Sequence, residues 1–124
     1  MPSQVEIAVD TYIRANRERD PALRQQLIEA CFAPDGRMVS RNRVVQGHAA
    51  LAAELTRFIS DPDVLGFRLV SVIDAVGNTF RYRSVAELRD GRSLEFFDAG
   101  EIDASGRITV LLLFAGPLRD VEEH

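Results

Sequence analysis

The fold is decided by residues 92–116, RSLEFFDAGEIDASGRITVLLLFAG, which predict two long strands joined by a tight turn. Asp103 to Gly106 supplies the turn, and Gly106 is suited to a positive φ. The second strand, Ile108 to Ala115, is apolar on both faces, so we expect both faces to be covered. In the first strand, alternate side chains share one face: Leu94, Phe96, Asp98, Gly100 and Ile102.

Asp98 is the unusual member of that face. Its neighbours on the face are apolar, and burying an ionised carboxylate among them is costly. None of them can solvate a charge, so we expect desolvation to raise the pKa of Asp98 above that of a free aspartate and to keep it protonated at neutral pH. Either the face is open to water at this point or Asp98 has a function.

Upstream of these strands the sequence predicts three amphipathic helices. Ser3 and Glu6 form a capping box for the first, and Asp20-Pro21 begins the second. Gly47-His48 opens the third, while Pro34-Asp35-Gly36 is expected to break the chain between the second and third. The buried stripe of the second helix begins at either Leu23 or Arg24 and continues with Leu27, Ile28 and Cys31.

The remaining segments predict strands. Short strands are expected at 37–40 and 44–45, and long ones at 66–76 and 79–88, with turn signals at Gly77-Asn78 and Asp90-Gly91. Three helices followed by a mostly antiparallel sheet define an α+β domain, expected to span residues 1–124. Because a sheet of this length curls, helices on its concave side would close a cone around a pocket. A second subunit is the simplest cover for the convex side.

Composition excludes several classes of protein. The 124 residues carry a net charge of −4 with scattered arginines, which argues against a nucleic-acid surface. No apolar run approaches the roughly 18 residues of a membrane span, and the N-terminus lacks a signal pattern. A single cysteine, Cys31, fits a reducing cytoplasm, and His48 and His124 have no metal-binding spacing. We therefore expect no metal and no cofactor.

Four segments accompany this order of elements: Cys31-Phe-Ala-Pro-Asp-Gly, Val45-Gln-Gly47, Asp103-x-x-Gly-Arg-Ile and Phe114-Ala-Gly-Pro. With them the chain resembles the nuclear transport factor 2-like (NTF2-like) superfamily, which includes the SnoaL-like polyketide cyclases and ketosteroid isomerase. The similarity runs from about Val5 to Pro117. The resemblance implies a cone-shaped fold that hosts many chemistries, and some members are not enzymes.

Ketosteroid isomerase is the informative relative, because its oxyanion hole pairs a tyrosine with a protonated aspartic acid. By this resemblance Tyr12 takes the place of the tyrosine and Asp98 that of the acid. The aspartate that shuttles the proton in that enzyme corresponds to Ser40, and a serine needs a partner base to do that work. Any base would otherwise be substrate-borne, a water or another side chain, for which His48 and Glu87 are the candidates.

Two hypotheses follow. In the first, an isomerase, cyclase or hydrolase binds a small apolar molecule, and Tyr12 with protonated Asp98 polarises its oxygen. In the second, the chain is a non-catalytic ligand-binding or dimerisation module. In both cases we expect a homodimer through the sheet. Seven further residues are expected to bind the ligand: Asn16, Met38, Ser40, Leu55, Phe58, Phe96 and Leu113.

Overall fold

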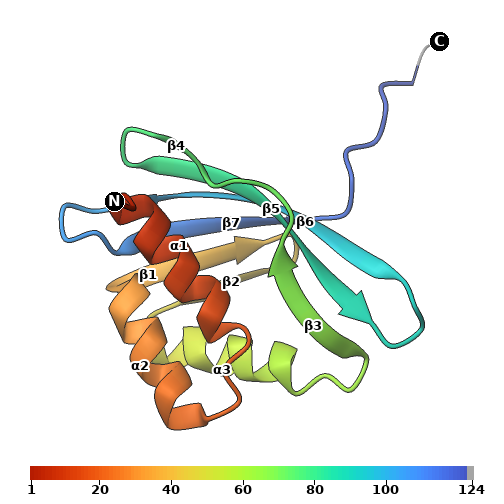
Figure 1. Cartoon of the computed structure of the whole chain (residues 1–124), viewed down its shortest axis with the longest axis horizontal. Coiled ribbons are helices and arrows are strands. Elements are labelled where there is room, and N and C mark those ends of the chain that lie inside the picture. The colour runs from red at the N-terminus through yellow and green to blue at the C-terminus, as the bar shows by residue number, and fades with distance from the viewer. Residues whose placement is uncertain (123–124) are drawn as a thin grey trace.

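The computed structural model describes residues 1–122, and His124 lies outside the described residues. Three helices gather against one face of a curved sheet (Figure 1), which confirms the predicted α+β class. The helices are α1 (Gln4–Ala15), α2 (Pro21–Cys31) and α3 (His48–Ile59). The strands are β1 (Phe32–Ser40), β2 (Arg43–Gln46), β3 (Val64–Leu69), β4 (Asp74–Val76), β5 (Thr79–Leu88), β6 (Ser93–Ile102) and β7 (Ile108–Ala115).

The sheet is mostly antiparallel, in the order β2-β1-β7-β6-β5-β3, with β4 paired to the other end of β5. The exception is β1, which lies parallel to β7, with Phe32 opposite Ile108. This pairing joins the early strands to the last one, and the helices lie over one face of the sheet (Figure 1). No helix among residues 1–122 combines the length and the apolar character needed to cross a bilayer.

The predicted helix starts are confirmed. The Glu6 backbone N–H donates to Ser3 Oγ at 3.1 Å, and the Ala22 N–H donates to Asp20 Oδ1 at 2.9 Å. In α2 the buried position is Arg24 and not Leu23, which is 46% exposed. Arg24 tolerates burial because its guanidinium donates to the Glu18 carbonyl at 2.7 Å and to Thr56 Oγ1 at 2.9 Å.

The expected break at Pro34-Asp35-Gly36 is wrong, because these residues lie inside β1. The register of β1 against β7 shifts between Phe32 and Arg37, so the extra residues form a bulge within the strand. Gly36 permits this close approach, since a Cβ there would lie 2.8 Å from the Ile108 carbonyl oxygen.

The single strand expected at 66–76 is also wrong, because two strands, β3 and β4, share that stretch. Ser71 lies at the interruption, where its Oγ accepts the Arg83 N–H at 2.8 Å. The Ser71 side chain therefore takes the Arg83 backbone N–H, which a continuous strand would pair with a backbone carbonyl. The following Val72 is 83% exposed, outside the sheet.

The core lies between the helices and the concave face of the sheet. The face shared by Leu94, Phe96 and Asp98 points toward the helices, as the alternation predicts, although Leu94 is exposed at the sheet's end. Fully buried residues from both layers meet there: Val9, Ile28, Phe32, Leu51, Ile108 and Leu111. This packing closes one part of the cone and leaves the other part open.

Candidate functional site

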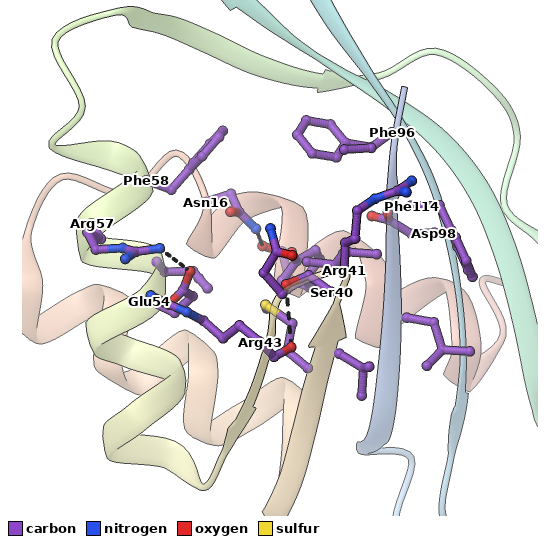
Figure 2. Close-up of a pocket in the computed structure, with 18 of the residues that line it drawn as sticks. Asn16, Ser40, Arg41, Arg43, Glu54, Arg57, Phe58, Phe96, Asp98 and Phe114 are labelled. Atoms are coloured by element: carbon purple, nitrogen blue, oxygen red, sulfur yellow. Dashed lines mark hydrogen bonds and ion pairs between the residues drawn. The ribbon is translucent and has the colours of Figure 1, made fainter. Parts of the chain in front are cut away.

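The open part of the cone is a pocket of about 810 Å³ between α1, α3 and the sheet (Figure 2). Its volume lies in the range typical of small-molecule sites. All nine residues predicted from the sequence line it. They are Tyr12 and Asn16 of α1, Met38 and Ser40 of β1, Leu55 and Phe58 of α3, Phe96 and Asp98 of β6, and Leu113 of β7.

Asp98 lies on the inner wall of the pocket and is only 1% exposed. Its Oδ1 has no hydrogen-bond partner among residues 1–122. Burial raises the pKa of the Asp98 carboxyl to about 7, while interaction with the Tyr82 hydroxyl lowers it by a smaller amount. The predicted direction of the shift is confirmed, but full protonation at neutral pH is not, because a pKa near 7 leaves about half of the carboxyl ionised there.

Tyr12 reaches the same pocket from the helix layer. It is buried, and its ring packs edge-to-face on Phe32 with centroids 5.8 Å apart. Burial first, and the charge of Asp98 second, raise the pKa of Tyr12 well above its ordinary value, so its hydroxyl remains a proton donor. No hydrogen bond joins the side chains of Tyr12 and Asp98, although both line the pocket.

Sequence reasoning missed the polar groups behind Asp98. Tyr82 lies directly opposite Asp98 in the β5–β6 register, and Ser84 is the next inward residue on β5. Both are buried, and neither hydroxyl has a partner of ordinary hydrogen-bond geometry among residues 1–122. A two-residue turn at Asp90-Gly91 would set Tyr82 opposite Ala99. The pairing of Tyr82 with Asp98 depends on the three-residue turn at 89–91, which the turn signal alone did not specify.

Charged residues surround the pocket mouth, and sequence reasoning missed these as well. Arg41 lies in the β1–β2 turn, Arg43 begins β2, and Glu54 and Arg57 come from α3, where Arg43 reaches Glu54 (Figure 2). Arg43 Nη1 lies 2.6 Å from Glu54 Oε2, and Arg57 Nη2 lies 2.9 Å from Glu54 Oε1. Spacing along the sequence gave no signal for this cluster, because it depends on how the turn meets the helix.

The candidate bases are not gathered at the pocket. His48 Nε2 donates to the Phe32 carbonyl oxygen at 2.8 Å, and Glu87 is held by Arg68 at 3.1 Å and Ser93 at 2.7 Å. Neither residue lines the pocket. Ser40 does line it, with its hydroxyl 3.4 Å from the Arg43 carbonyl oxygen.

Cys31 is a buried core residue, and burial raises the pKa of its thiol to about 12.

No protein-family model matches the chain, and no curated protein matches its sequence. Solved structures do match. A SnoaL-like family protein from Agrobacterium tumefaciens strain C58, for which isomerase activity has been suggested, superposes with a TM-score of 0.82 at 24% identity. The match covers 92% of this chain and 98% of that chain.

Two other solved structures also have a similar fold. An NTF2-like protein of unknown function from Burkholderia xenovorans LB400 has a TM-score of 0.70 at 14% identity, covering 96% of this chain and 88% of that one. A de novo designed protein with a curved β-sheet has a TM-score of 0.75 at 18% identity, covering 94% and 89%. The chain therefore has the NTF2-like fold, as its sequence predicted. Because a designed protein shares this shape, function has to be argued from the site.

Proposed function

We propose that the protein binds a small apolar molecule in this pocket and holds one oxygen of that molecule between Tyr12 and Asp98. The observation that carries the proposal is the Asp98 carboxyl, which is buried in the pocket wall with an unpartnered Oδ1. A buried polar atom without a partner costs free energy, and a ligand oxygen that pairs with it recovers that cost. A protonated acid and a phenol would together stabilise negative charge on that oxygen.

Two versions of this function differ in whether a proton moves. An isomerase, cyclase or hydrolase needs a base, and Glu54 is the carboxylate nearest to that role because it lines the pocket with Asp98. Both Glu54 oxygens already pair with arginines, however, and the position that bears a base in ketosteroid isomerase is Ser40. This arrangement favours the second version, a ligand-binding module without catalysis.

The binding site is tested with 2-naphthol, a planar phenol whose fluorescence separates its neutral and ionised forms. We expect the protein to bind it, and Tyr12→Phe and Asp98→Ala each to weaken binding by about tenfold, the effect of one lost hydrogen bond to a developing charge. Thr11→Val is the control, because it removes a hydroxyl from an adjacent position that does not line the pocket. Equal binding by all four proteins would refute the proposal.

The catalytic version is tested with Ser40→Asp, which places a carboxylate where the isomerase carries its base. If the pocket admits a 3-oxo-Δ5 steroid and aligns it as the isomerase does, the variant should exceed wild type by the ~10²–10⁴-fold typical of general-base catalysis. A folded Ser40→Asp variant with no gain in turnover would mean that Ser40 is not at the position of the base or that the pocket does not admit steroids, and would refute the steroid-isomerase form of the catalytic version.

The convex face supports a second part of the proposal, a homodimer through the sheet. Phe97 and Phe114 lie opposite each other in the β6–β7 register, 42% and 54% exposed. Adjacent exposed aromatic side chains on a sheet face are typical of protein interfaces.

The buried free thiol of Cys31 suits a reducing compartment, so we propose that the protein acts in the cytoplasm.

A further inference from the structure

The charge at the pocket mouth is opposite to that of the whole protein. The chain carries a net charge of −4, yet the mouth holds three arginines and one glutamate. Glu54 balances one of the arginines in charge although it contacts two, so the mouth is cationic overall. No acidic side chain among residues 1–122 lies within ion-pairing distance of Arg41. Charges of one sign around a cleft raise the local concentration of ligands of the opposite sign.

The pocket wall between the mouth and Asp98 is aromatic. Phe58 meets Phe67 edge-to-face with centroids 5.6 Å apart, and Phe67 meets Phe96 in the same way at 6.2 Å. These three side chains come from α3, β3 and β6, and all three line the pocket. Such a wall favours a flat apolar body, because aromatic groups gain from edge-to-face contacts beyond the area that they bury.

The inner end of this pocket suits a neutral oxygen better than a fully charged carboxylate. Whenever the buried Asp98 is ionised, a second full negative charge beside it would be repelled in surroundings that screen charge poorly. The cationic mouth and the unpartnered carboxyl of Asp98 therefore favour different chemical groups at the two ends of a ligand. The mouth suits a carboxylate, which guanidinium groups bind in a planar, bidentate way. The inner end suits a neutral oxygen.

We propose that the ligand is a monocarboxylate with a planar apolar body, bound with its carboxylate at Arg41, Arg43 and Arg57 and its far end toward Tyr12 and Asp98. This inference rests on the proposed function, since it names the class of ligand for the same pocket. Arg41 is the principal contact, and Glu54 competes with the ligand for the other two arginines.

The test compares three compounds that share a naphthalene body: 2-naphthylacetate, 2-(2-naphthyl)ethanol and 2-(2-naphthyl)ethylammonium. Calorimetric titration at about pH 6 keeps most of Asp98 protonated. We expect the acid to bind about tenfold more tightly than the alcohol, as for a charge-assisted contact, and the ammonium compound to bind most weakly. Raising NaCl from about 20 mM to about 300 mM should weaken only the acid, because salt screens the exposed arginines.

Two variants and a control locate the effect. Arg41→Gln should weaken the acid by about threefold to tenfold, the range for partly exposed ion pairs. Glu54→Gln should strengthen it, because the competing carboxylate is gone. Arg14→Gln makes the same charge change on an exposed position of α1 outside the pocket, and it should leave the affinity unchanged. The alcohol serves as an internal check, since its affinity should not change in any variant.

The outcomes separate the two proposals. If the alcohol binds and the acid binds no better, the inference about the carboxylate is overturned while the proposed function stands. If Arg14→Gln weakens the acid as much as Arg41→Gln does, the preference is a property of the whole surface, and the mouth is not its cause. If none of the three compounds binds, both the carboxylate inference and the proposed pocket function are refuted.

Discussion

The two faces of strands β5, β6 and β7 differ in the kind of side chain that is out of place. One face buries polar side chains, and the other exposes apolar ones. The concave face buries three polar side chains without hydrogen-bond partners among residues 1–122: Tyr82, Ser84 and Asp98. The convex face exposes two large aromatic side chains, Phe97 and Phe114. A stable fold alone requires neither arrangement, because each costs free energy in the isolated chain. The difference is what the proposed ligand on the concave face and the proposed dimer through the convex face would each explain.

The largest expected effect concerns Asp98. The folded protein holds this proton up to a pKa of about 7, against an ordinary value of 3.8, so the folded state binds more protons than the unfolded chain between these values. Stability should therefore fall as pH rises from about 4 to about 7, by on the order of 4 kcal/mol, and then level off. Asp98→Asn should remove this loss and be more stable than wild type at pH 8.

Urea unfolding at several pH values between about 5 and 8 measures this dependence. The exposed carboxyls with lowered pKa values, Glu87, Asp90 and Asp103, act below that range and with the opposite sign. Glu95→Gln removes a carboxyl from the convex face of the same strand and serves as the control. A wild-type stability that stays flat over this range would mean that the concave face solvates Asp98.

The second effect tests how closely the concave face is packed. Gly100 lies between Phe80 and Leu111 in the register, and a Cβ there would overlap the Val110 carbonyl oxygen and lie 2.8 Å from the Phe80 ring. We expect Gly100→Ala to cost about 3 kcal/mol, because the oxygen belongs to the backbone and cannot rotate away. Gly66→Ala is the control, since nothing lies within 4 Å of its Cβ. Thermal unfolding of both variants makes the comparison.

The third effect tests the convex face. Phe97→Glu should weaken the dimer by about 2 kcal/mol or more, as for an aromatic side chain at the centre of an interface. Sedimentation equilibrium of wild type should give twice the mass of the chain, and the variant should shift toward the monomer. Ile7→Glu places the same charge on an exposed position of α1 and should not change the mass. A wild-type protein that sediments as a monomer would contradict the proposed dimer.

The smallest effect refines the concave face. The Tyr82 hydroxyl lowers the pKa of Asp98, so Tyr82→Phe should raise that pKa. At about pH 5, where Asp98 is protonated in both folded proteins, stability should stay nearly unchanged. Carbon-detected NMR titration of the Asp98 carboxyl measures the shift. Tyr12→Phe is the comparison, because Tyr12 does not contribute to the shift at Asp98. A greater change in Tyr12→Phe would mean that the helix, and not the sheet, sets this acid's pKa.

Periodicity predicted most of the fold and the lining of the pocket. Alternation in β6 set Asp98 on the inner face, and the helical stripe of α1 placed Tyr12 there too, because both patterns depend only on local geometry. The interrupted strand between β3 and β4 was not predictable, since Ser71 takes a backbone donor from another strand. The arginine mouth escaped prediction for the same reason, because it forms only when the β1–β2 turn comes to lie beside α3.

The parallel pairing of β1 with β7 sets the order in which the protein can fold during synthesis. Phe32 meets Ile108, so the strand that follows the first two helices has no central neighbour until β7 has left the ribosome. Contacts that distant in sequence form late and slowly. Until then the exposed edge of β1 is open to pairing with other chains, and a nascent chain that ends before β7 has helices but no closed pocket.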